Sequence, residues 1–195
     1  MNQQPMFENP AEQYRRAMNL GHLLLSVWAM TLQLPMRRHC GKDFVGVTAC
    51  AGMLLIPLYV GFFNAPEIIY LLPIHVMFIV LHRLSAWTRR LRGIVTHTYY
   101  EGYPWVASAL FFTKDERYCR STHEPSLAVI AGLLLLPTAE SAGFYFIIGG
   151  FAMAIVQQFA DSQYQRRIDE INNGRIENEH FMRHVQQQQP SRRRR

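Results

Sequence analysis

Two long segments that are almost free of charge constrain the fold of this chain more than any other feature. Glu67 is the only charged residue between positions 44 and 82, and Glu140 is the only one between positions 125 and 160. A helix on the surface of a soluble protein presents a polar face to water, so apolar segments of this length are typical of membrane-embedded structure. The mean hydropathy of the whole chain, −0.05, hides the pattern because the charges gather elsewhere.

The first segment has the length of a helical hairpin. Residues 44–63 are uncharged and match the roughly 20 residues that cross a hydrocarbon core, and the sequence NAPE at 64–67 is typical of a turn. The return helix is shorter and needs residues up to Leu84 to complete a span, with the Arg83 guanidinium extending toward water. The pattern predicts a transmembrane hairpin over residues 44–84.

The second segment repeats this arrangement with a shorter first helix. Residues 126–137 and 142–160 flank the polar sequence TAES. A helix over residues 126–139 is about 21 Å long, against a hydrocarbon core of about 30 Å, so this hairpin either thins the bilayer or is re-entrant. We predict an all-α, polytopic membrane protein with two transmembrane helical hairpins, four spans in total, and additional interfacial or cytoplasmic helices.

The basic residues give an independent indication of orientation. Of the 20 Lys and Arg residues, five precede residue 44, seven lie between 83 and 124, and eight follow residue 160. Lys and Arg accumulate in cytoplasmic loops, so both termini and the central segment are expected in the cytoplasm. We expect a multi-pass protein of a bacterial inner membrane.

Changes in composition divide the chain into six predicted parts. These are an interfacial N-terminal segment (1–43), hairpin 1 (44–84), a basic and aromatic interfacial segment (85–124), hairpin 2 (125–160), a cytoplasmic amphipathic helical extension (161–185) and a disordered basic tail (186–195).

Both ends of the chain carry additional helical signals. Residues 20–34 form an apolar helix ended by Pro35, which either lies on the membrane surface, packs beside the hairpins or crosses as a fifth span. In the extension, Tyr164, Ile168 and Ile171 follow helical spacing, and the sequence NNG at 172–174 predicts a break.

A short repeat marks the first helix of each predicted hairpin. AGMLLIP at 51–57 returns as AGLLLLP at 131–137. Small residues allow helices to approach closely in lipid, and neighbouring helices can satisfy a backbone opened by proline. The hairpins are either related parallel repeats or share the sequence by chance. The predicted packing positions are Ala51, Gly52, Pro57, Ala131, Gly132, Pro137, Gly149 and Gly150.

His75 is the candidate functional polar residue within the predicted spans. An ionisable group in a membrane is energetically costly and therefore often functional, although a neutral imidazole can instead bond to a neighbouring helix. With Tyr59, it supports an alternative function as a small oligomeric transporter or channel. No Asp or Glu within the predicted spans forms a proton relay with it.

Catalytic motifs are absent from the sequence, so we expect a protein that is not an enzyme and needs no cofactor. It has no glycine-rich nucleotide loop and no serine nucleophile motif. A membrane-bound metalloenzyme is a weaker alternative, because ligand-type residues gather in the central segment without paired metal-ligand spacing. They are His97, Glu101, Cys119, His123 and Glu124.

Basic and aromatic residues next to the predicted spans suit an anionic lipid surface. We expect no nucleic-acid partner, because residues 186–195 contain no aromatic side chain on which bases could stack. The predicted headgroup contacts are Trp87, Arg89, Arg90, Arg92, Arg192, Arg193, Arg194 and Arg195. Arg37, Arg38 and Lys42 form a further basic patch.

These features together predict a non-enzymatic membrane subunit. The chain lacks a sizeable domain outside the predicted membrane segments, and its polar helical extension is suited to a partner. We expect it to assemble with other membrane proteins or with itself, and a secretion or transfer machine fits this description.

Overall fold

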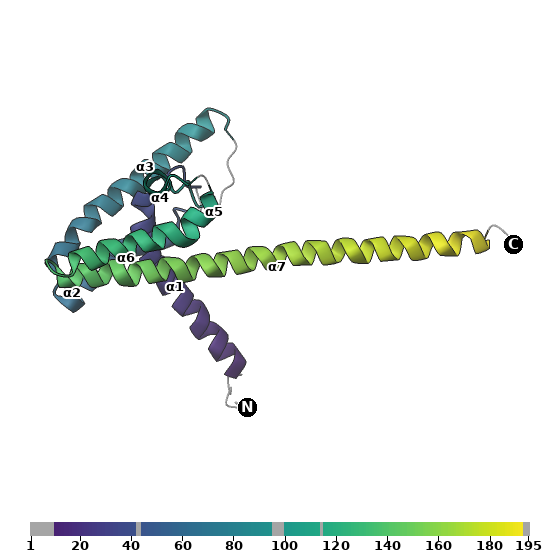
Figure 1. Cartoon of the computed structure of the whole chain (residues 1–195), viewed down its shortest axis with the longest axis horizontal. Helices are drawn as coiled ribbons and strands as arrows, with labels where there is room; N and C mark the ends of the chain where they lie inside the picture. Colours follow the sequence, from purple (N-terminus) through teal and green to yellow (C-terminus); the bar gives the residue numbers. More distant parts are fainter. Residues whose placement is uncertain (1–9, 42–43, 95–99, 114, 193–195) are drawn as a thin grey trace, which may run out of the picture. The chain divides into compact units, whose positions relative to one another are not determined.

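The computed structural model describes residues 10–41, 44–94, 100–113 and 115–192 (Figure 1). The described residues are predominantly helical and contain no strand, which confirms the all-α expectation. Arg38 and Tyr103 form an isolated antiparallel bridge. The chain divides into two compact units, residues 1–157 and 158–195.

The first unit contains hairpin 1 at the expected place. Helix α2 (Val47–Phe63) ends at Asn64, whose φ of 48° is left-handed, a conformation that Asn tolerates better than most residues at a helix end. The 3-10 helix η1 (Pro66–Tyr70) leads directly into α3 (Leu71–Leu91). Helix α3 extends beyond the predicted end of the hairpin at residue 84, so Trp87, Arg89 and Arg90 continue this helix and do not form a separate interfacial one.

Hairpin 2 consists of α6 (Glu124–Leu135) and the beginning of α7 (Glu140–Arg192). The two run side by side (Figure 1), and a Cβ on Gly132 would lie 2.7 Å from the Gly143 carbonyl oxygen. Likewise, a Cβ on Gly150 would lie 2.9 Å from the Pro125 carbonyl oxygen. The helices are therefore antiparallel, and the turn at residues 136–139 overlaps the predicted TAES turn.

Helix α1 (Pro10–Met36) packs into the core of the first unit. Residues 29–34 are all buried, on every side of the helix. This favours packing beside the hairpins over the surface-lying alternative, and Pro35 occupies the last turn as expected. Short helices α4 (Trp105–Phe111) and α5 (Glu116–Tyr118) and the π-helix η2 (Cys119–His123) connect the hairpins.

Among the described residues, two helical segments are long and apolar enough to cross a membrane, Pro66–Leu91 and Glu140–Met182. Helices α2 and α6 have 17 and 12 residues. At 1.5 Å per residue, they are about 25 and 18 Å long, both shorter than a typical hydrocarbon core. The structure thus contains the two hairpins but does not show four spans.

The first unit combines a polar interior with an apolar surface. His75, Arg37 and Glu124 are buried, whereas Val47 is 84% exposed and Phe62 is 79% exposed. A soluble protein rarely exposes such side chains over several helices. Its apolar core gathers residues from α1, α2, α6 and α7, among them Ala29, Leu32, Ile56, Ala128, Ala152 and Met153.

The second unit is the polar continuation of α7. The helix runs without interruption through Asn172, Asn173 and Gly174, so the predicted break is wrong. Residues 186–192 are also helical, whereas the sequence predicted disorder there. A Cβ on Gly174 would meet no atom within 4 Å, so neither packing nor a positive φ requires a glycine at this place.

Candidate functional site

His75 lies at the meeting point of α1, α2 and α3. Its Nε2 is 2.8 Å from the Ala49 carbonyl oxygen, and its Nδ1 is buried without a hydrogen-bond partner among the described residues. A Cβ on Gly52 would lie 2.8 Å from His75 Nε2 and 3.0 Å from Thr31 Cγ2. The absence of a side chain at Gly52 therefore makes room for the imidazole between the helices.

The two copies of the repeated heptapeptide have one geometric feature in common. Gly52 and Gly132 are both buried at close helix contacts, and Ala51 and Ala131 are both half-buried beside them. Pro57 lies inside α2, whereas Pro137 follows the end of α6. The copies thus differ in their secondary structure, although each provides a glycine for packing.

Glycines of α7 make similar close contacts. A Cβ on Gly149 would lie 2.4 Å from Leu32 Cδ1 of α1, and one on Gly150 would lie 2.7 Å from Val129 Cγ2 of α6. The consecutive glycines therefore serve two different helix neighbours.

Tyr59 belongs to a buried aromatic cluster. Its hydroxyl donates to the Ser141 carbonyl oxygen over 2.8 Å, and its ring centroid is 4.9 Å from that of Tyr145 and 5.7 Å from that of Trp28. The Tyr145 and Thr31 hydroxyls are 2.8 Å apart. The cluster connects α1, α2 and α7, and its polar groups are satisfied inside the protein.

Arg37 and Glu124 form a buried ion pair, with exposed fractions of 1% and 0%. Arg37 Nη2 donates to Glu124 Oε2 over 2.6 Å, and Nε donates to the same oxygen over 2.9 Å. Glu124 follows the π-helix η2 directly, and its backbone N–H donates to the Cys119 carbonyl oxygen. Attraction to Glu124 outweighs burial and raises the pKa of Arg37, so its guanidinium stays charged.

Further polar side chains join this pair to the rest of the central segment. Glu101 accepts from Arg37 Nη1 over 3.3 Å and lies 3.6 Å from Arg120 Nη1. Arg120 also pairs with Glu116, and Tyr100 donates its hydroxyl to the same carboxylate. Burial, with the Glu116 contact, raises the pKa of Tyr100 to about 12. We call the five charged residues, Arg37, Glu101, Glu116, Arg120 and Glu124, the polar junction.

The backbone beside the junction is closely packed. Gly102 has a φ of +92°, and a Cβ there would lie 2.6 Å from Cys40 Sγ and 2.9 Å from the Arg38 carbonyl oxygen. Arg38 and Tyr103 exchange two backbone hydrogen bonds of 2.8 and 2.6 Å. Only glycine tolerates both this φ and so close an approach of neighbouring atoms. The Cys40 thiol is buried at this contact, and burial raises its pKa to about 11.

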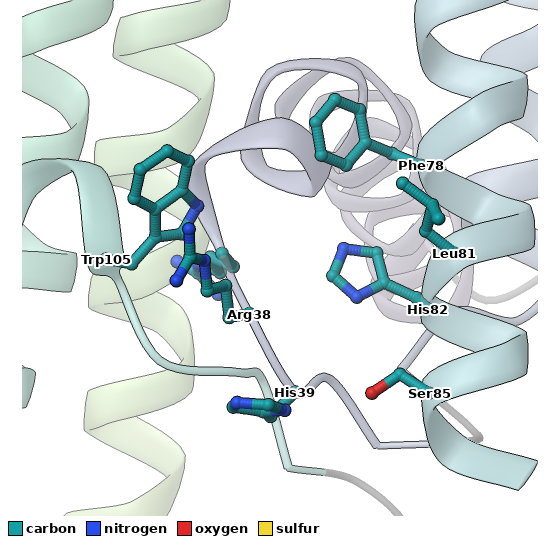
Figure 2. Close-up of a pocket in the computed structure, with 8 residues that line it drawn as sticks. Arg38, His39, Phe78, Leu81, His82, Ser85 and Trp105 are labelled. Carbon is teal, nitrogen blue, oxygen red and sulfur yellow. The ribbon is translucent and has the colours of Figure 1, made fainter. Parts of the chain in front are cut away.

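The predicted basic patch separates into two environments. Arg37 turns inward to Glu124, which corrects its assignment to a surface patch, whereas Arg38 is exposed and its guanidinium carbon lies 4.1 Å from the Trp105 ring centroid. Lys42 lies outside the described residues. Arg38 and Trp105 border a cavity of about 370 Å³ (Figure 2). The other lining residues are Arg37, His39, Phe78, Leu81, His82 and Ser85.

The predicted headgroup residues also have different roles in the structure. Trp87, Arg90 and Arg92 are exposed. Arg89 instead donates to the His39 carbonyl oxygen over 2.9 Å and to that of Cys40 over 2.8 Å, which joins α3 to the loop after α1. Arg192 is the last residue of α7, and Arg193, Arg194 and Arg195 lie outside the described residues.

The residues of the metalloenzyme alternative do not converge in the described part of the chain, where no group of three or more His, Cys, Asp or Glu could hold a metal. Glu124 is engaged by Arg37, and the His123 ring stacks on Phe111 with centroids 4.1 Å apart. Cys119 lies against the Thr113 carbonyl oxygen. His97 lies outside the described residues.

Sequence reasoning missed the Arg37–Glu124 pair and the cavity beside Arg38. One signal was available: Glu124 immediately precedes a long uncharged helix, where a buried carboxylate needs a cation. The choice among the nearby arginines depends on tertiary packing.

Comparisons with protein-family models, curated protein sequences and solved structures found no match.

Proposed function

We propose that this chain is a non-enzymatic integral membrane subunit that assembles with partner proteins in a larger membrane complex, and a secretion or transfer machine is one such complex that fits the description. The observation that carries the proposal is the polar half of α7. This helix continues beyond the first unit, from residue 158 to residue 192, and its described side chains there are mostly exposed.

The polar half of α7 carries an apolar stripe that suits a partner helix. Ile168, Ile171 and Met182 lie at intervals of three and eleven residues, which return to one face of a helix. Ile171 is 72% exposed and Met182 is 55% exposed. We call these three residues the α7 stripe. A helix this long, with apolar side chains in water, gains stability when a second helix covers them.

Membrane placement is supported by the two apolar helical segments and by the exposed apolar surface of the first unit. Only 22% of the apolar stretch of Pro66–Leu91 is buried within the protein, and 44% of that of Glu140–Met182. Helices with so much unburied apolar surface are suited to lipid contact.

We infer the orientation from the charge pattern. Both termini and the polar junction would face the cytoplasm of a bacterial inner membrane, and the turns at Asn64 and at residues 136–139 would lie on the far side. In the four-span arrangement, the bilayer thins around the short helices α2 and α6. In a two-span arrangement, these two helices are re-entrant.

Co-purification tests the proposed assembly. The intact tagged protein is extracted in mild detergent from its native membrane, beside an Ile168→Asp, Ile171→Asp double variant and an Asn173→Asp control on the opposite face of α7. The wild type and the control should elute with the same partner in a defined complex, and the stripe variant should lose it. A solitary wild-type monomer, after cross-linking in the membrane, would contradict the proposal.

A further inference from the structure

The cavity beside Trp105 is bordered by Arg38, a cation without a carboxylate partner in the part of the chain that the structure describes. Arg37 is paired with Glu124, but Arg38 forms no ion pair within the described residues. Its guanidinium lies instead over the Trp105 ring, and Trp105 is held by a 3.2 Å hydrogen bond from Nε1 to the Pro35 carbonyl oxygen. A guanidinium stacked in this way keeps its edge donors available for an anion.

The loop that carries this cation is held in place before any ligand binds. His39 has a φ of 61°, a left-handed conformation that is uncommon for a residue with a side chain. Two features maintain it: the backbone bonds between Arg38 and Tyr103, and the Arg89 contacts with the His39 and Cys40 carbonyl oxygens. Arg38 and His39 therefore border a preorganised opening (Figure 2).

The opposite wall of the cavity is formed by α3, which contributes two apolar and two polar side chains. Figure 2 shows Phe78, Leu81, His82 and Ser85 facing Arg38 and Trp105 across the opening. Leu81 is also 49% exposed on α3, where Met77 and Leu84 lie one turn away and are equally exposed. The cavity thus continues from a cationic edge to an apolar helix surface, and its volume is within the usual range for small ligands.

We propose that this cavity binds the phosphate group of an anionic phospholipid, with Arg38 as the main cationic contact and the α3 surface at Leu81 in contact with the acyl chains. The cationic edge alone would also fit a free phosphate. The adjoining apolar surface favours the lipid, because a free phosphate gains nothing from Leu81 or its neighbours. This inference depends on the membrane placement in the proposed function but not on the partner protein.

Lipid retention tests the site. The full chain is placed in bilayer discs of phosphatidylcholine with a minority of phosphatidylglycerol, then released and weighed with its bound lipids by native mass spectrometry. The wild type should retain phosphatidylglycerol preferentially. Arg38→Ala should reduce this preference about fivefold, as expected for one cation at a headgroup. Arg166→Ala, an exposed arginine on the polar half of α7 and outside the predicted headgroup contacts, should change it little.

Two further variants separate binding from folding. Arg38→Lys keeps the charge and should retain most of the preference, while Ser85→Met narrows the cavity without removing a cation and should reduce it. Circular dichroism and elution volume check that each variant is folded. If Arg38→Ala and Arg166→Ala reduce the preference equally, or if Ser85→Met has no effect, the cavity is not the binding site.

Inorganic phosphate distinguishes the two sources of the anion. Excess phosphate should leave retention of phosphatidylglycerol unchanged. Displacement by phosphate, with no preference for phosphatidylglycerol over phosphatidylcholine, would assign the cavity to a free anion and overturn the lipid proposal. The Ile168→Asp, Ile171→Asp variant should keep the lipid preference while it loses the partner, so failure of one proposal can be distinguished from failure of the other.

Discussion

Arg37 and Glu124 lie 87 positions apart in the sequence and form a buried ion pair in which two guanidinium nitrogens contact one carboxylate oxygen. The pair connects the end of α1 to the beginning of α6, next to the long loop between the hairpins. Removing either partner would be energetically costly, because the other charge would then be buried without a partner and away from water.

Arg37→Met should destabilise the protein strongly. The substitution leaves Glu124 buried without its main partner, a change that typically costs about 3–5 kcal/mol. Unfolding by denaturant in detergent micelles measures the loss, with the exposed Arg90→Met as control. The Arg37→Met, Glu124→Met double variant should recover much of it, and a double variant as unstable as the single one would show that the effect is not due to the stranded carboxylate.

Gly132→Ala should also destabilise the protein, through α6–α7 packing. The added methyl group would lie 2.6 Å from Ile147 Cγ1 and 2.9 Å from the Ile147 backbone nitrogen, so the helices must separate. Overpacking of this kind costs about 1–3 kcal/mol. Gly61→Ala in α2 is the matched control, since it meets nothing within 4 Å, and it should be neutral or stabilising. Equal effects of the two substitutions on the unfolding midpoint would contradict the close approach.

The apolar segments, their turns and the all-α fold follow from the sequence, because they depend on local hydrophobicity and turn residues. Asn64 ends α2 and Glu140 begins α7 near the predicted positions. The continuity of α7 through Asn172 and Asn173 contradicts the local signal. Asn and Gly each make helix formation less favourable by about 1 kcal/mol or less, which is too little to interrupt a helix of this length.

The candidate sites were less accessible to sequence reasoning. His75 and Gly52 were each predicted to matter, but their contact depends on how α2 and α3 pack. Three arginines with the same side chain have three different roles. Arg37 forms a buried ion pair, Arg38 borders the cavity, and Arg89 donates hydrogen bonds to backbone carbonyl oxygens. No pattern in the sequence distinguishes these roles, because each depends on the residues placed opposite by the fold.

Stability should fall in alkaline solution because of Cys40. Burial raises the pKa of its thiol to about 11 from an ordinary value of 9.0, so the unfolded chain releases this proton at lower pH than the folded protein. The folded state is therefore penalised progressively from pH 9 to pH 11, by up to about 2–3 kcal/mol.

Cys40→Ala isolates this contribution from other alkaline titrations, including that of Tyr100. The difference in unfolding free energy between the wild type and Cys40→Ala should stay constant below pH 9 and shift in favour of the variant between pH 9 and pH 11. A difference that does not change with pH would mean that the thiol is not buried in the folded protein.

A topology reporter distinguishes four spans from two. An enzyme active only outside the cytoplasm, inserted at Thr138 in the full chain, should be active if α6 crosses the membrane, as proposed from the charge pattern. Insertion at Thr113, in the central segment, is the control and should be inactive. Activity at neither site would indicate that α6 is re-entrant, and activity at Thr113 would reverse the proposed orientation.

The most direct test of the proposed assembly is photo-cross-linking in living cells. A photoreactive amino acid replaces Ile171 on the α7 stripe or Asn173, which lies about 160° around the helix at 100° per residue. Position 171 should form a covalent adduct with one defined protein, position 173 should not, and Ile168→Asp should abolish the adduct. Adducts of equal yield at both positions, or none at position 171 in membrane-inserted protein, would contradict the proposed assembly.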